Sequence, residues 1–156
     1  NVYDRTVAVR AAPKLKPAQC HFYGNEWGFE LVEDFAFSVH GGGVMSIPAG
    51  FWFNGGSVPA AFWQITYSPY DPRMLLGALP HDWLYCSHLT DRWTADMTLV
   101  DNLVAFGAAK AGMVKAAVRT FGGMFWRDTE RDKAYIGYLQ SRIIKEGRSL
   151  LKYGLA

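Results

Sequence analysis

Cysteine is scarce in this chain, with only Cys20 and Cys86 among 156 residues. Two cysteines so far apart in sequence do not make a disulfide framework, and their spacing is not that of a cysteine zinc site. We therefore expect both thiols to be free. Long apolar runs are also missing, because no run approaches the roughly 20 residues that a membrane-spanning helix needs. The sequence predicts no transmembrane segment.

Clustered charge is the next absence. Lysine and arginine number 16 against 14 aspartates and glutamates, and the basic residues are scattered along the chain. Proteins that bind nucleic acid concentrate basic residues on one face, so we expect no specific nucleic-acid partner. Half of the residues are hydrophobic and 15% are aromatic. This composition predicts a single domain over 1–156 with a large core, an apolar ligand groove or a protein interface.

The order of the patterns predicts an α+β fold, because strand-like segments come first and helix-like segments follow. A small antiparallel sheet should precede a glycine- and aromatic-rich loop, an antiparallel helix pair and further C-terminal helices. The expected strands span residues 6–9, 20–23, 29–39 and 44–47, with 11–18 as an extended connection and the last two strands as a hairpin. The expected helices span residues 71–86 with a kink at Pro80, 91–110, 113–121 and 129–152. The chain then divides into a sheet at 1–47, a loop at 48–70, a helical core at 71–126 and a C-terminal helix or arm at 127–156.

The clearest chemical pattern is a histidine beside a carboxylate, His81 and Asp82, answered by Asp96 on the next expected helix. Asp96 lies in the apolar stripe of its helix, where a carboxylate needs a partner. His81 comes about two helical turns before the break between the helices, and Asp96 about two turns after it. An antiparallel pair should bring them level. His81 shares its face with Tyr85, whereas Asp82 is turned about 100° away, toward a cleft or a metal.

The segment from Pro48 to Pro59 is different in kind, because glycines and prolines alternate with bulky aromatics and no period is sustained. Such a loop suits close approach of the backbone to a ligand or an ion. The alternative is a β-turn with a packed aromatic anchor.

Several short motifs between residues 47 and 126 are typical of one family. They are Pro48-Ala49-Gly50-Phe51, Phe53-Asn54-Gly55-Gly56-Ser57-Val58-Pro59, His81-Asp82-Trp83-Leu84-Tyr85, Ala95-Asp96 and Arg119-Thr120-Phe121-Gly122. Together they resemble a family of phages and prophages that is described only as a domain of unknown function. The resemblance implies a phage-derived protein of the virion, or otherwise of the host cytoplasm. Its partners would be other phage structural proteins or further copies of itself.

A second resemblance is to phospholipase A2 enzymes, which carry His-Asp-x-x-Tyr on one helix and an aspartate on an antiparallel helix, after a glycine-rich loop. This resemblance implies that His81 is the general base acting on a water molecule. Asp96 would then fix the tautomer of His81 and stabilise its imidazolium form. Tyr85 would hold the surrounding hydrogen-bond network. The substrate would be an ester of a membrane lipid.

The same resemblance implies a calcium ion. Asp82 would bind it together with oxygen atoms of the loop that contains Asn54, Gly55 and Gly56, and the ion would polarise the ester carbonyl. The phage family usually has aspartate at the position of Asn54. An asparagine still offers a carbonyl oxygen there, but without charge.

Three hypotheses therefore remain open from the sequence. The first is a calcium-dependent ester hydrolase, which predicts an open cleft at His81 and a cation beside Asp82. The second is a structural phage protein in which the His81–Asp96 pair only braces two helices. It predicts that both sites are covered and that the aromatic surface or the 129–152 helix packs on another subunit. The third is a zinc hydrolase that uses His81, His88, Asp82 and Asp96, although two histidines seven positions apart do not match the usual spacing on one helix.

Overall fold

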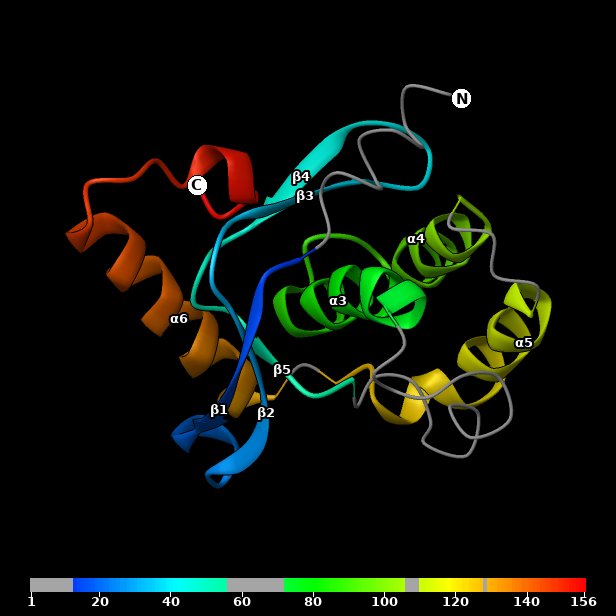
Figure 1. The fold of residues 1–156 in the computed structure, drawn as a ribbon, viewed down its shortest axis with the longest axis horizontal. Helices are drawn as coiled ribbons and strands as arrows, with labels where there is room; N and C mark the ends of the chain where they lie inside the picture. The colour runs from blue at the N-terminus through cyan, green and yellow to red at the C-terminus, as the bar shows by residue number, and fades with distance from the viewer. Residues whose placement is uncertain (1–12, 56–71, 106–109, 128) are drawn as a thin grey trace.

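The computed structural model describes residues 13–55, 72–105, 110–127 and 129–156. In these residues antiparallel strands precede helices, which confirms the α+β prediction. Helix α3 (Pro72–Ser87) lies in the middle of the molecule (Figure 1). In this view α6 (Glu130–Lys145) lies to the left of it, and α4 (Arg92–Ala105) and α5 (Ala111–Phe121) lie to the right. The expected helix pair is therefore the centre of the fold.

The larger sheet has three antiparallel strands in the order β1-β2-β5, which span Leu15–Cys20, Glu26–Leu31 and Trp52–Phe53. Pro17 lies in β1, where it replaces a residue that could donate a backbone hydrogen bond. This is tolerated because β1 is an edge strand. The sequence placed a connection over 11–18 and a strand over 20–23, and both boundaries were wrong. The strand ends at Cys20, and a 3-10 turn follows at His21–Tyr23.

The long strand expected over 29–39 is in fact two strands that belong to two sheets. β2 ends at Leu31, and β3 begins at Phe35. Leu31 exchanges backbone hydrogen bonds with the loop before β5, donating to Phe51 at 2.9 Å and accepting from Gly50 at 2.7 Å. These bonds hold the end of β2 on the larger sheet, and the chain bends before β3. The predicted loop over 48–70 also contains the short strand β5.

The expected hairpin is confirmed by β3 (Phe35–Ser38) and β4 (Val44–Ile47), which pair antiparallel. Phe35 and Phe37 are buried, whereas the residues between and after them are exposed. This is the alternation that predicted the strand. Three consecutive glycines at 41–43 have φ values of 88°, 124° and 90°. Such positive values make glycine the suitable residue for this turn.

The helices follow the predicted periods with corrected ends. α3 continues through Pro80 as one helix. Asp91 caps α4 by accepting a hydrogen bond from the Thr94 amide at 2.9 Å. α5 begins at Ala111, two residues before its expected start. The end of the expected 91–110 helix partly lies outside the described residues.

The last helix is shorter than predicted. α6 ends at Lys145 rather than near residue 152, because Gly147 has a φ of 72° and a separate 3-10 turn follows at Leu151–Tyr153. Its apolar stripe is used inside the molecule, since Tyr135, Leu139 and Ile143 are buried. The packing of this helix on another subunit, which the structural hypothesis predicts, stays a prediction. Among the described helices, none has the length and apolar character to cross a membrane.

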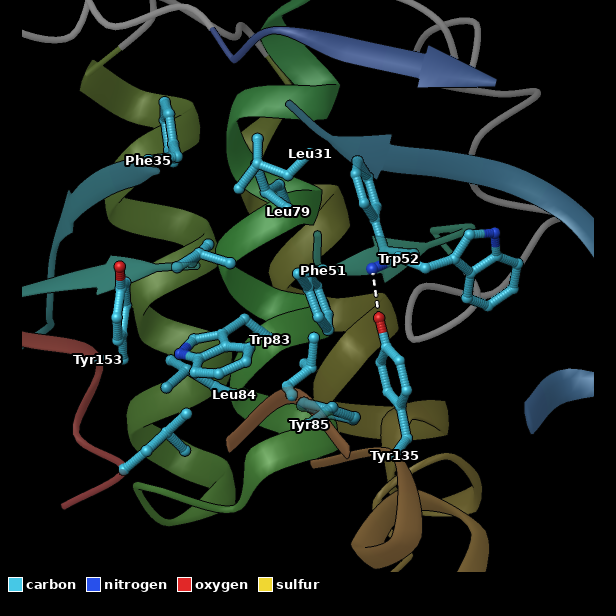
Figure 2. Packing of buried hydrophobic residues seen from close by; sticks show 14 of the residues in the cluster. Leu31, Phe35, Phe51, Trp52, Leu79, Trp83, Leu84, Tyr85, Tyr135 and Tyr153 are labelled. Carbon is cyan, nitrogen blue, oxygen red and sulfur yellow. Dashed lines mark hydrogen bonds between the residues drawn. The ribbon is translucent and has the colours of Figure 1, made fainter. Parts of the chain in front are cut away.

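Three aromatic residues of the expected loop, Phe51, Trp52 and Phe53, are buried in the core, and Figure 2 shows Phe51 and Trp52 there. Phe51 contacts the indole of Trp83 with the two rings almost perpendicular and their centroids 5.1 Å apart. The hydroxyl of Tyr135 on α6 accepts a hydrogen bond from the Trp52 backbone at 2.6 Å. Strand β5, α3 and α6 are therefore held together by this aromatic group. Both cysteines are free, as expected.

The C-terminal segment is anchored by Asp34 in the bend between β2 and β3. Its carboxylate accepts hydrogen bonds from the Tyr153 hydroxyl at 2.7 Å and the Ala49 amide at 2.8 Å. It also pairs with Lys152 at 2.7 Å and Arg148 at 3.4 Å. Burial alone would raise the pKa of Asp34, but the hydrogen bonds from Lys152 and Tyr153 outweigh it and lower this pKa. The folded state therefore favours the ionised carboxyl.

This shift predicts acid sensitivity. The folded pKa of Asp34 lies below its unfolded value, so its contribution to stability is present above the unfolded pKa of about 4 and is lost as the pH falls through the folded pKa. We expect the free energy of unfolding, measured with urea, to decrease between pH 5 and pH 2. Asp34→Asn should be less stable at pH 7 and should lose part of this pH dependence. Glu33→Gln is the control, and an equal effect in both variants would contradict the prediction.

Candidate functional site

His81 on α3 and Asp96 on α4 meet in the interior, as the helix spacing predicted. The Nε2 atom of His81 lies 2.8 Å from Oδ1 of Asp96, and both side chains are completely buried. An ionised carboxylate can only accept hydrogen bonds, so Nε2 carries the proton and donates it. Because Asp96 lies in the apolar stripe of α4, its carboxylate points inward and meets His81 on α3.

Asp96 is bonded to more groups than the sequence suggested. Its Oδ1 atom also accepts a hydrogen bond from the Tyr85 hydroxyl at 2.6 Å, and its Oδ2 atom accepts one from Nη1 of Arg119 at 2.6 Å. The Nε atom of Arg92 lies 3.6 Å from the same Oδ2. Two guanidinium groups, a phenol and an imidazole therefore surround one carboxylate. Both oxygens are occupied, which is what a buried charge requires.

The two arginines connect this pair to α5. Nη2 of Arg92 donates to the backbone carbonyls of Val118 at 2.6 Å and Arg119 at 2.9 Å, in the last turn of that helix. Carbonyls at the end of a helix lack some of their helical partners, and that of Val118 also accepts the amide of Gly122. Gly122 follows directly, and a Cβ atom on it would lie 2.6 Å from the Tyr85 hydroxyl oxygen. The Arg-x-x-Gly motif therefore supplies a cation at Arg119 and, at Gly122, the space that the Tyr85 hydroxyl needs.

The network sets the ionisation of its members. Burial alone would raise the pKa of Asp96, but hydrogen bonds from His81 and Tyr85, the charge of His81 and the hydrogen bond from Arg119 together lower it. Burial, followed by the hydrogen bond to Asp96, raises the pKa of Tyr85. At neutral pH Asp96 is therefore ionised and Tyr85 is protonated. Together with the arginines they form a connected network of hydrogen bonds and ion pairs around one carboxylate.

Asp82 faces the glycine-rich loop, which is the arrangement that the phospholipase resemblance implied. Its side chain accepts a hydrogen bond from the Gly55 amide at 2.8 Å, and the residue is 8% exposed. The neighbouring Asn54 donates from Nδ2 to the carboxylate of Glu26 at 3.0 Å. Gly56, also predicted as a metal ligand, lies outside the described residues. The glycine-rich loop thus contacts Asp82 through the backbone N–H group of Gly55.

Calcium is bound by six to eight oxygen atoms, whereas Gly55 presents its N–H to Asp82 and the Asn54 amide donates to Glu26. The calcium site therefore stays a prediction. Of the residues of the zinc hypothesis, His88 stacks on the ring of Trp126 with centroids 4.0 Å apart. Within the described ranges, no three His, Cys, Asp or Glu side chains are grouped so that they could share a metal ion.

A pocket is lined by Asp82 and Tyr85. Its volume is about 240 Å³. Asp82 and Tyr85 line it together with residues from the N-terminal strands and from α6, whereas His81 is not among the described lining residues. The sequence indicated Asp82 and Tyr85 as site residues but gave no signal for the residues on the opposite wall, which are distant in sequence.

A family model described as a protein of unknown function, DUF1353, matches residues 29–118, which is more than half of the chain. The chain belongs to the DUF1353 family. The matched range contains every residue that the sequence predicted for the site, and it ends one residue before Arg119. The DUF1353 match thus spans the hairpin, β5, α3 and α4, but not α6. No curated protein and no solved structure matches the chain.

Proposed function

We propose that this chain is a phage-derived structural protein in which His81 and Asp96 brace the helical core, and that it is not a hydrolase. The observation that carries the proposal is the environment of Asp96. Its two oxygens are bonded to His81, Tyr85 and Arg119, and neither His81 nor Asp96 is exposed to solvent. A general base must reach a water molecule and a substrate. A buried pair whose carboxylate already has hydrogen-bond partners at both oxygens is suited to holding helices together.

An assembly role is also supported by the surface of α5 and the turn after it. Large apolar side chains are exposed there, among them Met113, Phe121, Met124 and Phe125. Trp93 on α4 is about half exposed and lies under the guanidinium group of Arg119. Exposed apolar groups on neighbouring elements are typical of protein interfaces. The partners we propose are other phage structural proteins or copies of this chain.

A lipid-ester hydrolase is the second candidate, and one observation favours it. Asp96 binds Nε2 of His81, and Tyr85 donates to the same carboxylate, which is the set of roles that the phospholipase A2 resemblance implied. Asp82 and Tyr85 also line a pocket. In this candidate His81 would take a proton from water while Asp96 holds the ring.

The two candidates are separated by replacing His81. In phospholipid vesicles with calcium or with a chelator, we expect no calcium-dependent release of fatty acid by the native protein. We expect His81→Ala to lower the free energy of unfolding by about 2 kcal/mol or more, because Asp96 then loses a buried donor. Calcium-dependent release of fatty acid that disappears in His81→Ala, while the stability of the protein is retained, would contradict the proposal that His81 and Asp96 only brace the helical core.

His40 provides a matched control. Its Nδ1 atom lies 2.7 Å from Oδ2 of Asp101, so the pair has nearly the same length as the buried one, but Asp101 is half exposed. Exposed pairs contribute about 0–1 kcal/mol, so His40→Ala should have a much smaller effect than His81→Ala. The assembly role is tested by mass spectrometry of purified particles of the phage that encodes the chain. Absence of the protein from the particles would contradict it.

A further inference from the structure

Among the described residues that line the pocket beside Asp82 are three carboxylates, those of Glu26, Asp82 and Asp132, and one guanidinium group, that of Arg131. Two other titratable groups add no charge at neutral pH. Burial raises the pKa of the Cys86 thiol to about 12, and burial also raises the pKa of the Tyr23 phenol. The described part of the pocket wall therefore has a formal net charge of −2. Such a pocket favours a cationic ligand.

The remaining wall is aromatic. Tyr23, Phe51, Trp52, Phe53, Tyr85 and Phe125 all line the pocket. The rings of Tyr23 and Trp52 are stacked, with centroids 5.2 Å apart and an angle of 18° between them. Aromatic faces attract cations, and organic ammonium groups bind well where several rings meet. The carboxylates and the ring faces of the pocket therefore both favour a cationic ligand.

One cation of the protein already uses this wall. The guanidinium carbon of Arg131 lies 4.7 Å from the centroid of the Tyr23 ring. This contact already places one positive charge over the Tyr23 ring. It also means that Arg131 competes with any cationic ligand, both by its position and by its charge.

We propose that this pocket binds a small organic ammonium group. Its volume of about 240 Å³ is below the usual range for drug-sized ligands, so the ligand is a small amine or a terminal ammonium group. The inference does not depend on the brace, because His81 and Asp96 take no part in it. Of the charged groups, only Asp82 lies within the residues matched by the DUF1353 family. The charge on the other wall is thus contributed by residues outside that match.

The proposal is tested by titrating the isotopically labelled protein with tetramethylammonium and, separately, with methylammonium, while recording ¹H–¹⁵N NMR spectra. Sodium chloride at equal concentration and neutral tert-butanol are the reference titrations. We expect saturable shifts at pocket amides such as Gly55 with an ammonium probe but with neither reference. If tetramethylammonium binds more tightly, the ring faces are the main contact. If methylammonium binds more tightly, the carboxylates are the main contact. Shifts that do not saturate with either probe would overturn the proposal.

Variants give effects of opposite sign. Glu26→Gln should weaken binding by about three- to tenfold, because a nearby opposite charge is removed. Arg131→Gln should tighten it by a similar factor, because a like charge and a competitor for the Tyr23 ring are removed. Glu33→Gln and Lys145→Gln are the matched controls, since neither residue lines the pocket, and they should change the affinity less than twofold. If the two pocket variants change the affinity no more than the controls, the binding lies elsewhere and the proposal fails.

Discussion

Replacing Asp96 by asparagine should lower the free energy of unfolding by about 3–5 kcal/mol, the range found when one partner of a buried ion pair is removed. The carboxylate accepts from His81 and Tyr85 at one oxygen and from Arg119 at the other. An amide has the same shape but only one oxygen, so its NH₂ group must face at least one donor. The charges of Arg92 and Arg119 also lose their nearby counter-ion. Urea unfolding at pH 7 measures the loss.

Asp101 on the same helix is the control for this substitution. It accepts a hydrogen bond from His40 at 2.7 Å, but its side chain is half exposed. We expect Asp101→Asn to cost less than about 1 kcal/mol, because water replaces the lost contact. If Asp96→Asn and Asp101→Asn were equally mild, the buried network would not be a brace, and the proposed function would lose its main support.

The second large effect is expected at Trp83, which lies midway between His81 and Tyr85 in the sequence and is buried in the core. Its indole is completely buried, packs against Phe51 and directs its Nε1 toward the sulfur of Met45 at 3.4 Å. Trp83→Ala should therefore cost about 3–5 kcal/mol through the cavity that it leaves. Such a loss approaches the whole stability of an ordinary domain. The midpoint of urea or thermal unfolding, followed by circular dichroism, would show it.

Trp93 allows a matched comparison, because it is the same residue type on the neighbouring helix but is 47% exposed. Its ring is covered only in part, by the charged groups of Lys115 and Arg119. Trp93→Ala should cost about 1 kcal/mol or less. A loss for Trp93→Ala as large as for Trp83→Ala would mean that the packing described around α3 is wrong.

Much of the fold was predictable because its signals are local. The hydrophobic period of α4 indicated that Asp96 points inward, and Asp96 is completely buried, whereas Asp101 on the same helix is exposed. The break between β2 and β3 has only a weak local signal. Alternation fails at Val32 and Glu33, but the backbone pairing of Leu31 with Gly50 and Phe51, which lie far away in sequence, cannot be inferred from that failure. A period describes which side a residue faces, not where a strand changes sheets.

The candidate site was predictable to the same extent. His81, Tyr85 and Asp96 could be placed together because two helices and a short connection fix their relative positions. Arg92 was detectable in principle, since it precedes Asp96 by four positions on one helix. Arg119 was not, because its position depends on how α5 packs against α4. The roles proposed for these residues in catalysis stay predictions, whereas their positions are now described.

The network around Asp96 has a consequence for how the molecule opens. The carboxylate on α4 is bonded to the imidazole of α3 and to the guanidinium group of Arg119 on α5. If any one of the three helices moved away, the buried bonds of Asp96 to His81 or to Arg119 would break. Separation of a single helix is therefore costly. The three helices should therefore unfold as one cooperative unit, and their most protected amides should exchange with solvent at a common rate. The C-terminal segment is tied to Asp34 instead and takes no part in this network.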